Sequence, residues 1–600
     1  MWIVAFLAAL GTQDAVEAKR GAALKTFKDK VHPFLEAYCI KCHGTRPKGG
    51  VTLVHLLKSP ATPAFSPLWK RVAGQVKAHT MPPEDAAKQP KAGERAAVME
   101  WIDGIKYLSP KDPGEFVIRR LNRVEYGNTL RDLLGVEPGL AEALPEEVFG
   151  AGYANSVSPL LMEKYLAIAG EAIGKMTRRD LLEGTDAREV ARTMARRAYR
   201  RPPADAEVDL LMKVHALAKG RSEEEARRLM LKAVLVSPQF LFITPGGDVP
   251  SQPIVALDDH QLAARLSYFL WSSPPDAELS RLADAGKLRE NLAAQARRLL
   301  ADPRSRALFD GFGRQWLGLD KLAGKTFDPA KFPQMSAALK DAMVEEARLF
   351  FESVLRDDRS LATLIEADYT FVNETLAPLY GLKAEGPEMR RVAVSGDRGG
   401  ILTMPGVLAQ TSFPNRTSPV NRGAWVLEHV LGEHVPPPPA DVPALDDQKK
   451  EEVAALTLRQ RTELHRTNPT CASCHKVLDP IGFGLENFDA IGRWRDRDDS
   501  GGPIDAAGEL PGERRFRSPK ELKAIVAARI HDVARTLAGR LLAYALCRQL
   551  VGYDEVVVDG LAEQAAQDGY KLQGLVVGVV TSYPFTHRRV HDLKGAAHGK

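Results

Sequence analysis

The sequence predicts a mainly α-helical, multidomain protein with a small cysteine-containing module near each end. Apolar residues recur at helical spacing along most of the chain. Alternation of apolar and polar residues, which would indicate strands, is scarce. The 600 residues suffice for about four domains. The pattern C-x-x-C-H occurs twice, at Cys39–His43 and at Cys471–His475.

Both motifs have the spacing of a covalent haem attachment site, in which two thiols form thioethers and the adjacent histidine binds iron. They use four of the 5 cysteines of the chain. A redox dithiol expects a βαβ context, which neither flank provides, and a Cys₄ zinc site needs no histidine after the second cysteine. The sequence therefore predicts two covalently bound c-type haems, held by Cys39, Cys42, His43, Cys471, Cys474 and His475.

Composition and the N-terminus indicate the compartment. The net charge is only +5, and no basic stripe points to nucleic acid. Residues 2–10 are apolar and precede Val16-Glu17-Ala18, which predicts a signal peptide over residues 1–18. The alternative is the start of a buried helix. No other stretch reaches the ~18 apolar residues of a membrane span, so we expect a periplasmic or exported bacterial protein.

The first haem module is expected over residues 22–108. Apolar spacing predicts a helix from Thr26 to Tyr38 that leads into Cys39. Ser66-Pro67 has the N-cap and N1 pattern of a second helix start. Residues 93–102 read as a closing amphipathic helix. This order of elements resembles that of small monohaem cytochromes c.

Met81 is the predicted distal ligand of the first haem iron. It precedes two prolines, which stiffen the loop around the thioether. A thioether opposite His43 would raise the reduction potential relative to two histidines. The rival ligand is His79, two residues earlier in the same loop.

The second haem module is expected over residues 397–497. Pro436–Pro439 is predicted to be a polyproline II connector, followed by a helix from Asp446 to Arg466. A backbone carbonyl near Pro480 is expected to accept the Nδ1 proton of His475. We expect Arg493 and Arg495 to neutralise haem propionates, with surface ion pairs as the alternative. Trp494 is expected to pack on the macrocycle.

The distal ligand of the second haem must come from upstream, from a histidine or from nothing, because all 12 methionines lie at or before position 404. Met404 precedes Pro405 and so repeats the Met-Pro pair of the first module. Met404 is therefore the predicted ligand. The alternatives are an open iron or one of the histidines, His429, His434, His531 and His587.

The segment between the motifs is predicted to be helical. Helical periodicity covers residues 116–134, 189–199, 223–236, 262–271 and 337–354. We expect helical domains over residues 113–178, 183–245, 253–382 and 515–590. Asp258-Asp259 reads as helix-capping charge. Cys547 lies in an apolar helical run and is expected to be a buried core thiol.

The chain resembles the large c-type cytochromes of planctomycetes and related bacteria. In that family a cytochrome c module precedes five domains of unknown function, the penultimate one carrying a second C-x-x-C-H. The stretches that carry the resemblance are Arg120–Tyr126, Leu160–Tyr165, Ala198–Pro202, Arg265–Trp271, Ala367–Asn373, Arg416–Val420, Cys471–Trp494, Leu541–Leu546, Val579–Ser582 and Phe585. The resemblance implies haem and an extracytoplasmic location but no established activity.

These observations favour a di-haem cytochrome that exchanges electrons with a redox partner protein in the cell envelope. One alternative is a peroxidase-like oxidoreductase with an open iron at the second haem. Another is a redox-linked scaffold whose helical middle docks a partner protein or a glycan. The sequence assigns no substrate and no catalytic residue.

Overall fold

The computed structural model describes residues 16–60, 62, 66–77, 79–145, 157–244, 252–394, 396–435, 456–467, 469–512 and 514–590. Most of the predicted signal peptide and the polyproline connector at residues 436–439 lie outside this part. The side chains of Cys471 and Cys474 also lie outside it, although their backbone belongs to a described helix. No helix in the described ranges is long and apolar enough to cross a membrane.

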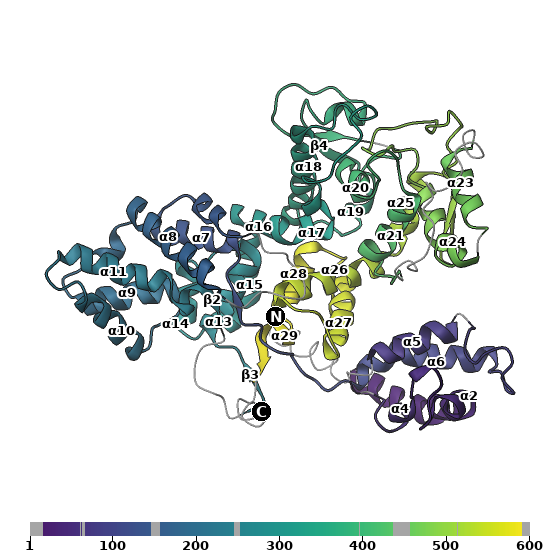
Figure 1. Cartoon of the computed structure of the whole chain (residues 1–600), viewed down its shortest axis with the longest axis horizontal. Helices are drawn as coiled ribbons and strands as arrows, with labels where there is room; N and C mark the ends of the chain where they lie inside the picture. Colours follow the sequence, from purple (N-terminus) through teal and green to yellow (C-terminus); the bar gives the residue numbers. More distant parts are fainter. Residues whose placement is uncertain are drawn as a thin grey trace.

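The fold is mainly α-helical, as predicted. The described strands are short and form four two-stranded antiparallel sheets. The buried apolar residues divide into three cores, one in the N-terminal module, one in the following helical domain and one shared by the rest of the chain. Figure 1 shows the N-terminal module at the lower right, set apart from the other helices.

The N-terminal module packs around a pair of tryptophans. The rings of Trp69 and Trp101 lie 4.8 Å apart, and their indole nitrogens donate to the carbonyls of Pro60 and Ala23. These bonds satisfy the buried N–H groups. Its helices are the π-turn η1 (Phe27–Val31), α2 (His32–Tyr38), α3 (Ile40–His43), α4 (Val54–Lys58), α5 (Ser66–Lys77), α6 (Ala92–Gly104) and the 3₁₀ turn η4 (Ile105–Leu108).

The next domain is a helical bundle closed by a short sheet. The strand β1 (Arg119–Arg120) pairs with β2 (Phe242–Ile243) and so joins the two ends of the domain. Between them lie α7 (Arg123–Leu134), α8 (Pro159–Lys175), α9 (Ala187–Tyr199), α10 (Asp205–Ala216), α11 (Glu223–Leu235) and α12 (Pro238–Leu241).

The third core spans residues 257–585. Its first part contains β3 (Ile254–Ala256), α13 (Asp259–Trp271), α14 (Ala277–Asp284), α15 (Leu288–Ala301), α16 (Arg306–Leu308), α17 (Arg314–Trp316), α18 (Ala337–Arg356), α19 (Thr363–Glu366), β4 (Tyr369–Val372) and β5 (Arg390–Ala393). Its second part contains α20 (Pro405–Gln410), α21 (Pro419–Trp425), α23 (Leu458–His465), α24 (Pro469–Phe483), β6 (Gly508–Leu510) and β7 (Arg514–Phe516).

The C-terminal helices complete this core. They are α25 (Pro519–Ala528), α26 (Ile530–Leu546), α27 (Tyr553–Gln567), α28 (Leu572–Thr581) and α29 (Tyr583–Thr586), followed by β8 (His587–Arg589). The last strand, β8, pairs with β3, so the two ends of the region are joined by backbone hydrogen bonds.

Two expectations about local structure were wrong. The helix expected from residue 116 begins at Arg123, because Asn122 and Glu125 form a capping box and the preceding residues pair as β1. Cys547 is only partly buried. It ends α26 in a left-handed conformation, with φ of 53°, and the apolar run stops one residue before it.

Candidate haem sites

The first C-x-x-C-H lies where α2 ends and α3 begins. The Cys39 amide donates to the carbonyl of Leu35, and the amides of Cys42 and His43 donate back to Cys39. Cys39 and Cys42 are free, half-buried thiols. Burial, with a smaller contribution from Cys42, raises the pKa of the Cys39 thiol to about 11. In the chain alone, Cys39 is therefore a protonated thiol at neutral pH, unlike the low-pKa thiol of a redox nucleophile.

The ring of His43 is oriented by the loop that follows the motif. Its Nδ1 lies 3.0 Å from the carbonyl oxygen of Val51. Because a carbonyl can only accept, Nδ1 carries the proton and Nε2 presents the lone pair. The Leu53 amide donates to the His43 carbonyl at 2.8 Å, which fixes the loop to the motif. This donor set, two thiols and an imidazole with Nε2 available, fits a c-type haem.

The Met81 loop is anchored to the neighbouring helices. The Met81 carbonyl accepts from Arg95 Nη1 at 2.9 Å, and the Met81 amide donates to the carbonyl of Gln75. The side chain of Met81 is 38% exposed. His79, the rival ligand, is exposed and has a φ of 57°. The loop is thus held through its backbone while the Met81 thioether faces outward, and the assignment of Met81 as a ligand stays a prediction.

The second C-x-x-C-H lies within α24, which continues for two further turns after the motif. His475 Nδ1 lies 3.0 and 3.1 Å from the two carboxylate oxygens of Asp479. The expectation that a backbone carbonyl near Pro480 accepts the Nδ1 proton was wrong. Because α24 stays helical up to Phe483, Asp479 lies one turn after His475 and its side chain reaches the ring first.

His465 and Arg466 lie close to His475 and Asp479. The rings of His465 and His475 are 5.0 Å apart in an edge-to-face arrangement. Arg466 Nε lies 3.9 Å from Asp479 Oδ2. Burial raises the pKa of the Asp479 carboxyl, and burial lowers the pKa of His465. Sequence reasoning missed both His465 and the carboxylate of Asp479. The spacing of four residues between His475 and Asp479 was the available signal.

The cationic residues after α24 have protein carboxylates as partners. Arg493 Nε lies 2.6 Å from Asp489, and Arg495 Nη2 lies 3.0 Å from Glu486. Trp494 is 42% exposed. All three line an open cleft of about 530 Å³ that Lys331 and Arg416 border. These contacts match the alternative of ion pairs, and the propionate role of Arg493 and Trp494 stays a prediction.

Met404 and His475 lie in different surroundings. The Met404 side chain is 2% exposed and belongs to the apolar core. Its neighbour Pro405 packs closely against Gly492, in the loop after α24. His475 lies on the half-buried surface beside α23. These surroundings do not favour Met404 as the distal ligand, and its assignment stays a prediction.

Two of the histidine alternatives, His429 and His587, have partners of their own. His429 Nδ1 lies 2.9 Å from the carbonyl oxygen of Trp316, and its ring stacks on Trp425. His587 lies in β8 and contacts the hydroxyl of Thr586 at 3.0 Å. Both histidines thus take part in the packing of the third core.

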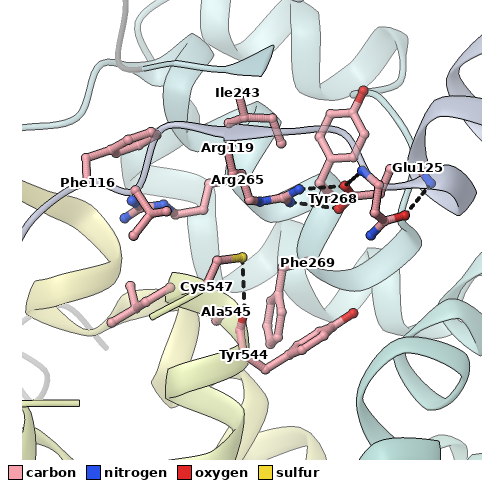
Figure 2. Close-up of a pocket in the computed structure, with 13 residues that line it drawn as sticks. Phe116, Arg119, Glu125, Ile243, Arg265, Tyr268, Phe269, Tyr544, Ala545 and Cys547 are labelled. Atoms are coloured by element: carbon pink, nitrogen blue, oxygen red, sulfur yellow. Dashed lines mark hydrogen bonds and ion pairs between the residues drawn. The ribbon is translucent and has the colours of Figure 1, made fainter. Parts of the chain in front are cut away.

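A separate pocket joins the helical domain to the C-terminal helices (Figure 2). Arg265 is half-buried there, donates to the carbonyls of Pro584 and Phe585, and packs over the ring of Phe116. Cys547 lines the same pocket and donates to the Tyr544 carbonyl at 3.4 Å. The cavity measures about 30 Å³, whereas small-molecule sites are typically 300–1,000 Å³. The cavity is therefore much smaller than a typical small-molecule site.

Six family models match the chain in one continuous order. Residues 39–85 match Planctomycete cytochrome C. The other matches are described as proteins of unknown function: DUF1587 (119–178), DUF1595 (186–244), DUF1592 (257–382), DUF1588 (398–498) and DUF1585 (512–585). The chain matches no curated protein and no solved structure. The order of these modules shows that the chain belongs to the planctomycete multidomain family of c-type cytochromes.

Proposed function

We propose that this chain is a di-haem c-type cytochrome that transfers electrons in the bacterial cell envelope. The observation that carries the proposal is the shared state of the two motif histidines. His43 and His475 each have Nδ1 engaged by an oxygen acceptor, so that Nε2 is the nitrogen available to iron.

Each haem would be held by the residues of its own C-x-x-C-H motif. Cys39 and Cys42, and likewise Cys471 and Cys474, would form the thioethers, and Met81 would complete the first site. A bound haem supplies one-electron redox chemistry. The protein orients the iron ligand through the acceptor at Nδ1 and surrounds the site with packed helices.

An oxidoreductase with an open iron at the second site is the second candidate. Its specific support is the buried carboxylate at His475 Nδ1, because an anionic acceptor makes the imidazole a stronger donor than a carbonyl does. The enclosed position of Met404 in the apolar core points the same way.

The haem content of the full chain tests the proposal. We expect two haems per denatured chain, and loss of one in the Cys39→Ala, Cys42→Ala double variant, because each motif attaches its own haem. Mass spectrometry and the absorbance of the pyridine complex measure both numbers. Cys547→Ala is the matched control and should retain both haems, since Cys547 lies outside the motifs. A single haem in the native chain, or full occupancy in the double variant, would contradict the proposal.

A further inference from the structure

The two motif histidines differ in the charge of the group that accepts their Nδ1 proton. For His43 the acceptor is the neutral carbonyl of Val51, at 3.0 Å. For His475 it is the carboxylate of Asp479, with both oxygens within 3.1 Å. The two sites otherwise have the same C-x-x-C-H donor set.

The Asp479 carboxylate is enclosed by the protein. It is fully buried, and the neighbouring Leu478 and Ile481 are also buried in the apolar core. The cation facing it is Arg466, at 3.9 Å and beyond hydrogen-bond distance. A buried charge is weakly screened by solvent, so the field of this carboxylate at the His475 ring is stronger than that of a surface group.

We infer that Asp479 is a positioning residue that makes the second haem site the more reducing of the two. An anionic acceptor at Nδ1 increases the basicity of the ligating imidazole, which stabilises the more positive ferric state. The buried negative charge acts in the same direction. At the first site the neutral acceptor leaves the imidazole less basic. The inference rests on the proposed function, because it requires a haem at His475.

The order of the two potentials can be measured without altering Asp479. A spectroelectrochemical titration of the native chain should resolve two potentials. The Cys39→Ala, Cys42→Ala variant retains only the second haem, and its potential should equal the lower of the two native values. If that haem has the higher potential, the inference is overturned while the di-haem proposal stands. If the native chain binds a single haem, both fail.

The substitution Asp479→Asn isolates the carboxylate. An amide keeps the size of the side chain and can still accept a hydrogen bond, but it carries no charge. At a fixed ambient potential we expect the ferric-to-ferrous ratio of the second haem to fall about tenfold, which corresponds to about 59 mV for one electron. The first haem serves as an internal control and should not change. The iron–histidine stretching band in the Raman spectrum of the second haem should move to lower frequency, as the imidazole becomes a weaker donor.

A matched control is Asp505→Asn, which removes the same charge from the same region. Asp505 has a side chain 60% exposed and pairs with Arg459. Neither potential should move in this variant, because an exposed charge is screened. Equal effects of the two substitutions, or an unchanged second potential in Asp479→Asn with both haems retained, would overturn the inference.

Discussion

At the scale of single residues, Glu346 on α18 is a buried acid within the apolar core. Its side chain is fully buried, and Oε1 accepts hydrogen bonds from the hydroxyls of Thr370 and Tyr380. The second oxygen, Oε2, has no hydrogen-bond partner in the described part of the chain. Burial raises the pKa of Glu346 to about 7, against the opposing effect of the two hydroxyls.

This carboxyl predicts a loss of stability as pH rises. The pKa of Glu346 is higher in the folded state than in the unfolded state, so the folded state keeps the proton up to a higher pH. The free energy of unfolding therefore falls as the pH rises from about 4.5 to about 7. The difference between the two pKa values corresponds to roughly 3 kcal/mol in the free energy of unfolding. Urea unfolding at several pH values should show Glu346→Gln gaining stability relative to the native chain over this range. A difference between the two proteins that does not depend on pH would contradict the assignment.

Candidate ligand residues can be identified from the sequence more readily than the groups that surround them. The C-x-x-C-H pattern is local, so the motif alone identifies the cysteines and histidines. The partner of His475 depends on whether α24 continues to Asp479, which the sequence does not decide next to Pro480. Glu346 lies in an amphipathic pattern, and its burial follows from packing of β4 against α18, a contact between distant segments.

At the scale of elements, the contact between α21 and α24 depends on two glycines. A Cβ at Gly423 would lie 2.0 Å from the carbonyl oxygen of Leu478, and one at Gly482 would lie 1.9 Å from that of Pro419. The helices approach so closely that only glycine fits. Arg422, 1% exposed, crosses the contact and donates to the backbone that follows α24.

The substitution Gly423→Ala should destabilise this contact. The new methyl group meets backbone, which cannot move aside as a flexible side chain does, so we expect a cost of at least about 1–3 kcal/mol. The proposed second haem site lies on α24, so its iron should lose histidine ligation, seen as a shift of the Soret band, at a lower urea concentration than the iron of the first site. Gly560→Ala in α27 is the control, since no atom lies within 4 Å of its Cβ position and alanine favours helix by about 1 kcal/mol. Equal stability of the two variants would contradict this view of the contact.

Most helices were predictable, and the strands were not. The regions expected at residues 189–199, 223–236, 262–271 and 337–354 correspond to α9, α11, α13 and α18. Asp258 caps α13 as expected, by accepting from the Gln261 amide. The strands are two to four residues long and pair with distant segments, as β3 does with β8. Such short strands carry no periodicity of their own.

At the scale of the whole molecule, the N-terminal haem module docks on α27 through a small polar contact. Asp559 accepts from Tyr107 at 2.9 Å and from Arg535 at 2.7 Å, and it also binds Lys106. Its side chain is 14% exposed. The module has its own core, so this contact sets its position relative to the other domains.

Replacing Asp559 with Asn should release the module without unfolding it. Loss of hydrogen bonds to a charged group costs about 2 kcal/mol. Small-angle scattering should show a larger radius of gyration, and limited proteolysis should cut faster between the module and β1. Glu563→Gln is the control, because its pair with Lys19 is exposed and worth at most about 1 kcal/mol. Identical scattering of the native chain and the Asp559 variant would show that other contacts position the module.

The pairing of β3 with β8 also has a consequence for the order of events during synthesis. The strand β8 follows every helix of the third core, so β3 cannot pair until β8 has been synthesised. Contacts between distant segments form late in folding because their loop-closure entropy is large. The motif at Cys471–His475 precedes β8 and is accessible during that delay. Attachment of the proposed second haem would therefore be easiest before this core closes.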